Sequence, residues 1–243
     1  SGLHRSPFTG ASIEFAQYRP YVQGDDLRFV DWSLYARTDR LHTKQFHKET
    51  NLRCSILLDC SASMRYASKQ ISKFRYAQMI AACLSMLLFR QNDEMGLIAF
   101  DEKLQTFLPP RHNPQHLRRI LTDITNAQAQ QGTAISPALK QAADTLPHRG
   151  LVILISDLLS PVEELLPPIK QLSARRHDVV ILQITDLAEQ DFPFQKSATF
   201  IDPESGRELF VVPDHVREEY HNNRNLHFET IRKECLSAEI DIQ

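Results

Sequence analysis

The chain alternates between short apolar runs and longer segments in which apolar residues recur every three or four positions. Continuous apolar runs, typical of buried parallel strands, cover residues 52–59, 94–101, 150–156 and 178–185. Helical spacing occupies residues 73–91, 114–124, 137–146 and 163–176. One further short strand, residues 104–108, is expected to pair antiparallel with residues 94–101 and to end at Pro109.

This order of strands and helices predicts a doubly wound α/β fold with a mainly parallel sheet and helices on both faces. From residue 198 the pattern changes, because two short apolar runs flank Ser205 and Gly206, which predicts a β-hairpin. A long helix over residues 213–237 follows, and residues 239–243 predict the start of a last strand. We therefore divide the chain into an N-terminal arm, residues 1–50, and an α/β domain, residues 51–243, which includes the hairpin and the long helix.

Side chains with oxygen atoms stand where the predicted strands and loops end. Asp59, Ser61 and Ser63 recur at every second position directly after the first strand of the α/β domain. Thr133 lies in a polar loop ahead of a helix, and Asp157 ends another strand. Ligands of such folds bind at the carboxyl ends of the strands, and Mg²⁺ or Mn²⁺ prefers oxygen donors. The residues together predict a Mg²⁺ or Mn²⁺ site, whereas an Asp-x-Ser-x-Ser loop alone is equally typical of a helix cap.

The sequence Asp-x-Ser-x-Ser, followed by Thr and then by Asp, resembles the metal-ion-dependent adhesion site of von Willebrand factor A domains. The resemblance implies that Ser61, Ser63 and Thr133 coordinate the metal. It also implies that Asp59 and Asp157 bind the metal or its water ligands. One position departs from the family's pattern, because Gln131 stands where members commonly have a second glycine; the ligand set is unchanged.

The N-terminal arm carries the most specific motif, Gly-Asp-Asp-x-Arg-x-x-Asp-Trp, at residues 24–32. This motif, with residues 10–21, 36–37 and 44–49, resembles a bacterial and archaeal conserved domain family of unknown function that contains a von Willebrand factor A-like domain. Members are typically encoded beside MoxR-type AAA+ ATPases, and the resemblance covers nearly the whole chain. From the residues themselves we expect a docked arm, held by Asp–Arg pairs and a buried Trp32 indole; a partner-binding surface is the alternative.

Composition narrows the classes of partner. The chain has 28 Lys and Arg against 30 Asp and Glu, so no general attraction to nucleic acid or to anionic membranes is expected. Its longest apolar runs are too short to span a membrane. The four cysteines lack C-x-x-C spacing and favour reduced thiols. We expect a cytoplasmic protein, with membrane association through segments outside this chain left open.

The functional hypothesis is a non-enzymatic adaptor that presents its metal to an acidic residue of another protein. A ligand set rich in hydroxyls leaves positive charge on the ion, which an incoming Asp or Glu neutralises. The resemblance implies as partner a MoxR-type AAA+ ATPase, or a client that is remodelled or fitted with a cofactor. The alternative is a Mg²⁺-dependent hydrolase or phosphatase that uses Asp59. Such enzymes carry Asp-x-Asp with the second carboxylate as general acid, and Ser61 occupies that position here.

Overall fold

The computed structural model describes residues 5–10, 14–49, 52–129, 135–146, 149–203 and 205–243. The chain forms two compact units, Ser1–Leu52 and Arg53–Gln243. Each unit has its own sheet, antiparallel in the first and mainly parallel in the second.

The N-terminal unit is built on a three-stranded antiparallel sheet in the order β1-β3-β2. The strands are β1 (Arg5–Gly10), β2 (Glu14–Pro20) and β3 (His42–Glu49). Between β2 and β3 lie the 3₁₀ turn η1 (Leu27–Phe29) and the helix α1 (Trp32–Thr38). The Asp31 carboxylate caps α1 by accepting the Leu34 N–H, so an aspartate of the motif starts this helix.

Trp32 is exposed, so the prediction of a buried indole was wrong. Its exposed fraction is 56%, and its ring makes an edge contact with Tyr35 at 6.3 Å between centroids. Among the described side chains of this unit, Val30 is the sole buried hydrophobic one, so no apolar core formed by these side chains encloses the indole. Charged pairs are present, including Asp31 with Lys44 at 2.9 Å.

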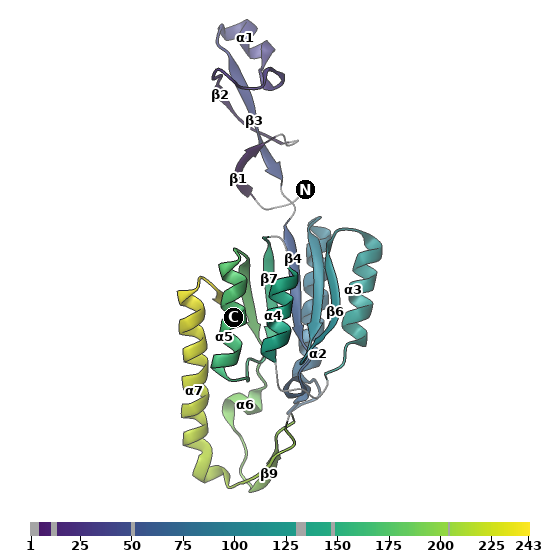
Figure 1. The fold of residues 1–243 in the computed structure, drawn as a ribbon, viewed down its shortest axis with the longest axis vertical. Helices are drawn as coiled ribbons and strands as arrows, with labels where there is room; N and C mark the ends of the chain where they lie inside the picture. The colour runs from purple at the N-terminus through teal and green to yellow at the C-terminus, as the bar shows by residue number, and fades with distance from the viewer. Residues whose placement is uncertain (1–4, 11–13, 50–51, 130–134, 147–148, 204) are drawn as a thin grey trace. The chain divides into compact units, whose positions relative to one another are not determined.

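The second unit contains a six-stranded sheet in the order β11-β8-β7-β4-β5-β6, as Figure 1 shows in part. All neighbours are parallel except β5 and β6, which are antiparallel. This confirms the predicted mainly parallel α/β sheet. In chain order the strands are β4 (Arg53–Asp59), β5 (Glu94–Phe100), β6 (Leu104–Arg111), β7 (Leu151–Ser156), β8 (Asp178–Gln183) and β11 (Asp241–Ile242).

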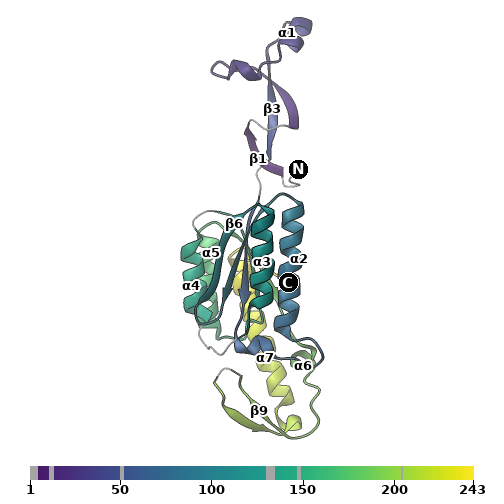
Figure 2. The ribbon, with the colours of Figure 1, turned by 90° about the vertical axis from the view of Figure 1, so that its right-hand side faces the viewer.

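Helices cover both faces of this sheet, as predicted for a doubly wound fold (Figure 2). On one face lie α2 (Lys73–Arg90) and α3 (Pro114–Asn126), and on the other α4 (Ile135–Thr145) and α5 (Val162–Ala174). The long helix α7 (Pro213–Ser237) packs against α5 and β11. No helix in the described part of the chain is both long enough and apolar enough to cross a membrane.

Two elements differ from the prediction. Strand β6 continues through Pro109 and Pro110, because it is an edge strand on which a proline removes no hydrogen bond that the sheet requires. The short helix α6 (Leu187–Asp191) was not predicted, since five residues are too few for a helical period. The antiparallel pair of β9 (Ala198–Ile201) and β10 (Glu208–Val211) confirms the predicted hairpin.

Strands β4 and β7 both end at the lower edge of the sheet in Figure 1. The 3₁₀ turn η2 (Ala62–Arg65), the helix α6 and the β9–β10 hairpin lie at the same end of the unit. The carboxyl ends of parallel strands are where such folds bind ligands. The fold therefore places the loops after β4 and β7 together at one edge.

Candidate metal site at the carboxyl ends of the strands

The loop after β4 brings three oxygen-bearing side chains together. The Asp59 carboxylate accepts the Ser61 N–H at 2.8 Å, and the Ser61 and Ser63 hydroxyls lie 3.1 Å apart. Asp59 and Ser61 are fully buried, and Ser63 is 9% exposed. Two of the five predicted ligands are thus joined directly through their hydroxyl groups, and the third is hydrogen-bonded to the same loop.

Asp157 reaches this edge from β7, the neighbour of β4. Leu58 pairs with Ile155 across the two strands, so the residues that follow leave the sheet side by side. Asp157 is 2% exposed, and its negative charge acts on Asp59. The structure therefore brings Asp157 to the same edge as the loop after β4. Thr133 lies outside the described residues; α4 begins two positions later, at Ile135.

Ser156 joins the two strands and was missed by the sequence analysis. Its hydroxyl donates to the Asp59 carboxylate at 2.5 Å and accepts the Leu158 N–H at 3.1 Å. The residue is 1% exposed and ends an apolar run, so its sequence position indicated only a strand end. In the structure it orients the carboxylate of Asp59.

The turn after Asp157 is strained. Leu158 adopts φ 57°, in the left-handed region that side chains other than glycine rarely enter, and its side chain is fully buried. The His227 ring of α7 contacts the Leu158 carbonyl oxygen at 2.7 Å and helps to hold this conformation. Strain of this kind is often retained at functional sites, where the surrounding structure imposes it.

Asp59 is a buried carboxylate whose charged form is disfavoured by its surroundings. Burial raises the pKa of the Asp59 carboxyl well above its ordinary value, and the charge of Asp157 raises that pKa further. Among the described residues, no Lys or Arg forms an ion pair with Asp59, whereas Asp157 pairs with the Lys73 ammonium at 2.8 Å. A cation beside Asp59 would stabilise its charged form in this dry position.

The donor chemistry fits Mg²⁺ or Mn²⁺. The described members of the predicted set offer carboxylate and hydroxyl oxygens, which these ions prefer, and no imidazole or thiolate of the kind that zinc prefers. Within the described residues there is no cluster of three or more His, Cys, Asp or Glu side chains arranged to hold a metal. The predicted set combines two carboxylates with hydroxyls, so it belongs to a different class of site.

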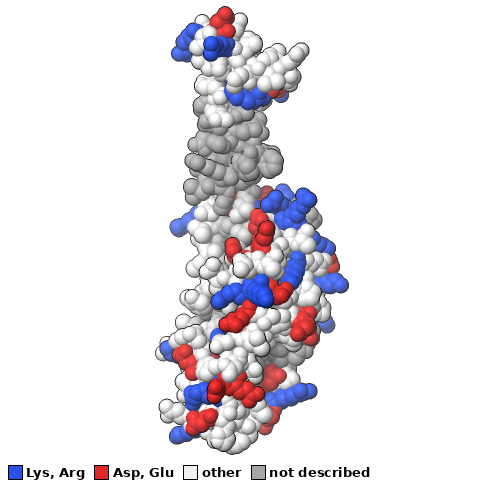
Figure 3. Space-filling model, turned by 90° about the vertical axis from the view of Figure 1, so that its left-hand side faces the viewer, with Lys and Arg blue, Asp and Glu red and all other residues white. Residues whose placement is uncertain are grey.

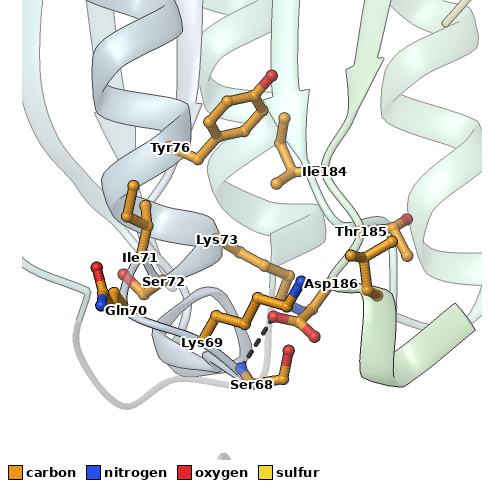
Figure 4. A pocket seen from close by; sticks show the side chains of 11 residues that line it. Ser68, Lys69, Gln70, Ile71, Ser72, Lys73, Tyr76, Ile184, Thr185 and Asp186 are labelled. Carbon is orange, nitrogen blue, oxygen red and sulfur yellow. Dashed lines mark hydrogen bonds between the residues drawn. The ribbon is translucent and has the colours of Figure 1, made fainter.

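Cavities lie beside Asp157, Lys73 and Glu189. One of about 990 Å³ lies between the start of α2 and the residues after β8, and Figure 4 shows Lys73 and Asp186 among the side chains that line it. A second, of about 340 Å³, has Asp157 in its wall. A third, of about 520 Å³, is lined by aromatic residues of α7, of β9 and of the segment that follows α6, and it shares Glu189 and Tyr220 with the second.

Comparison with known proteins gives a family match. The model of a family described as "Protein of unknown function DUF58" matches residues 17–230. Uncharacterized proteins of Mycobacterium tuberculosis and Mycobacterium bovis are 29% identical over 217 residues, which is 87% of this chain and 68% of theirs. Most of the N-terminal unit and nearly all of the α/β unit fall inside the matched range.

Solved structures are similar in fold. The conserved hypothetical protein BatB from Bacteroides thetaiotaomicron matches 79% of this chain and 90% of its own, with a TM-score of 0.51 and 17% identity. The von Willebrand factor domain of the type V pili tip protein Mfa5 from Porphyromonas gingivalis matches 46% of this chain and 40% of its own, with a TM-score of 0.36 and 17% identity. The match to BatB agrees with the doubly wound, mainly parallel α/β fold of the second unit.

Proposed function

The chain belongs to the DUF58 family of proteins of unknown function, and we propose that its α/β unit is a metal-dependent module for binding other proteins. The observation that carries the proposal is the meeting of Asp59, Ser61 and Ser63 with a second buried aspartate at the edge of the sheet. Asp59 is buried, and within the described part of the chain no Lys or Arg forms an ion pair with it, which supports a bound metal ion.

In this proposal five residues would hold Mg²⁺ or Mn²⁺: Asp59, Ser61, Ser63, Thr133 and Asp157. Bound there, the ion would supply positive charge for a carboxylate of a partner protein. The residues of the chain orient the ligands, since Ser156 hydrogen-bonds Asp59 and the strained Leu158 sets the turn after Asp157.

The surface around the site supports a protein partner. The hairpin presents Ile201, Leu209 and Phe210 with exposed fractions of 62%, 66% and 68%. They stand beside the aromatic cavity, whose wall continues through Glu189 and Tyr220 to the cavity that contains Asp157. Exposed apolar patches of this kind are typical of protein-binding surfaces.

Charge on the visible face does not favour nucleic acid. On the side of α7, Figure 3 shows Lys and Arg interspersed with Asp and Glu, without a continuous basic stripe. We propose a MoxR-type AAA+ ATPase, or a client protein acted on by one, as the partner, and its Asp or Glu as the group that meets the metal. We also propose a cytoplasmic location, which the four free cysteines support.

We propose no catalytic role. A hydrolase that forms a covalent intermediate on Asp59 would use a general acid two positions later, and Ser61 is a buried hydroxyl that donates no proton at neutral pH. The alternative hydrolase would be supported by hydrolysis of a phosphate ester that depends on both Mg²⁺ and Asp59.

The proposal is tested by measuring the binding of a MoxR-type AAA+ ATPase to the immobilised chain in Mg²⁺ and in EDTA. Binding is expected in Mg²⁺, to fall in EDTA, and to be lost in Ser61→Ala. Ser68→Ala is the matched control, because Ser68 is an exposed serine at the same edge of the unit. If the wild-type chain binds as tightly in EDTA as in Mg²⁺, and Ser61→Ala binds as tightly as wild type, the metal site is not the contact.

A further inference from the structure

A lysine is buried against the candidate metal site. Lys73, the first residue of α2, is 3% exposed. Its ammonium group donates to Asp157 at 2.8 Å and to Glu189 at 2.6 Å, and it lies 5.9 Å from the centroid of the Tyr66 ring. Lysine is almost never buried to this extent unless it is paired. Both of its partners are carboxylates, and one of them is a predicted metal ligand.

Glu189 is held in place by contacts that do not involve Lys73. Its second carboxylate oxygen accepts the Asp186 N–H at 3.1 Å and completes the capping box of α6. Its carbonyl oxygen accepts the Tyr220 hydroxyl at 2.7 Å. Lys73 therefore has one partner inside the candidate site, Asp157, and one anchored on the neighbouring helix α6.

Lys73 is the cationic partner of one of the two predicted carboxylate ligands. It pairs with Asp157 and with Glu189, whereas Asp59 forms no ion pair with a Lys or Arg among the described residues. The ammonium occupies one oxygen of Asp157, and the other accepts the Leu159 N–H at 3.3 Å. A metal ion that binds Asp157 must therefore compete with Lys73.

We propose that Lys73 is an internal cation that neutralises Asp157 while the site holds no divalent ion, and that it thereby limits the affinity of the site for metal. Glu189 is the positioning residue that retains Lys73 when Asp157 binds the ion. This inference rests on the proposed function, since it concerns the same site. It assigns opposite effects to the two residues: loss of Lys73 strengthens metal binding, and loss of the Glu189 charge weakens it.

The test is calorimetric titration of Mg²⁺ into the metal-stripped full chain. Lys73→Met is expected to bind Mg²⁺ roughly tenfold more tightly than wild type, because one positive charge beside the ion is gone. Glu189→Gln is expected to bind roughly tenfold more weakly, while glutamine still accepts the Asp186 N–H of the capping box. In EDTA, Lys73→Met should unfold at a lower temperature than wild type, and Mg²⁺ should raise its Tm by more.

Matched controls separate these effects from a general change of charge. Lys69→Met removes an exposed lysine that lines the same cavity and, in Figure 4, extends toward Asp186 as Lys73 does. Glu219→Gln removes an exposed carboxylate that lines the aromatic cavity together with Glu189. Both controls are expected to bind Mg²⁺ within about twofold of wild type, since these charges are exposed and screened.

The outcomes distinguish this inference from the proposed function. If wild type binds Mg²⁺ but Lys73→Met binds no more tightly than Lys69→Met, the inference is wrong and the metal site stands. If neither wild type nor Lys73→Met binds, both are wrong. If Lys73→Met does not fold, Glu189→Gln decides: weaker binding than in Glu219→Gln supports the inference, and equal binding overturns it.

Discussion

Replacing Ser156 by alanine tests whether hydrogen bonds between β4 and β7 hold the candidate site together. The variant loses the bond to Asp59 and leaves the Leu158 N–H without its acceptor, at a position that is 1% exposed. A hydrogen bond to a charged group contributes about 2 kcal/mol, and a buried unpaired N–H costs about 1 kcal/mol or more. We therefore expect the free energy of unfolding to fall by about 3 kcal/mol.

Urea denaturation followed by far-UV circular dichroism measures this change. The same loss lowers the Tm by roughly 6–12 °C for a unit of this size. The matched control is Ser85→Ala, which removes a fully buried hydroxyl that donates to Ala81 within helix α2. Ser85→Ala should lower the free energy of unfolding by no more than about 1 kcal/mol, because the Ala81 carbonyl that accepts this hydroxyl belongs to the regular helix.

The same variant links stability to the proposed function. Since Ser156 orients Asp59, we expect Ser156→Ala to bind Mg²⁺ at least roughly tenfold more weakly, as is usual when a residue behind a metal ligand is removed. If the free energy of unfolding of Ser156→Ala lies within about 0.5 kcal/mol of the wild-type value, this reasoning is refuted, because the hydroxyl would then not support the site.

Further predictions concern both units. Trp32→Ser should change the free energy of unfolding by less than about 0.5 kcal/mol, since the indole is 56% exposed; a larger loss in urea denaturation would indicate a packed indole. Lys44, with the Leu34 N–H and the Tyr18 hydroxyl, holds the pKa of Asp31 well below its ordinary value. The charged Asp31 carboxylate therefore stabilises the fold fully at pH values above its ordinary pKa. This contribution is lost as the pH falls through the lowered pKa. An acid titration of Trp32 fluorescence should show this loss in wild type and not in Asp31→Asn; identical titrations would contradict it. Phe210→Ser should leave Mg²⁺ binding unchanged in calorimetry, because this exposed residue belongs to the hairpin; a weakened affinity would place the hairpin in the metal site. In Mg²⁺, the wild-type protein should hydrolyse a generic phosphate ester no faster than Asp59→Ala does; a higher rate in wild type would support the hydrolase.

The central elements of the fold could be predicted from the sequence because each is self-contained. Strands β4, β5, β7 and β8 are continuous apolar runs, as strands buried on both faces must be. The start of α3 was marked by Asn113, whose side chain accepts the His116 N–H. Strand order and the position of α7 follow from packing between distant segments.

The contacts of the candidate site that are local in sequence could be predicted, and those between distant segments could not. Asp59, Ser61 and Ser63 lie within five residues, so their spacing alone predicted that they meet. Lys73 gave no such signal, because a lysine at the start of a helix is usually solvated and its partner Asp157 is 84 positions away. Trp32 was misjudged because the motif shows paired charges but does not show that the indole lies on the surface.

The most direct test of the central claim is calorimetric titration of Mg²⁺ and Mn²⁺ into the metal-stripped protein, with Asp59→Ala alongside. The account predicts saturable binding of one ion per chain in wild type and loss of that binding in Asp59→Ala. Absence of binding to wild type at millimolar concentration, or equal binding to Asp59→Ala, would contradict it.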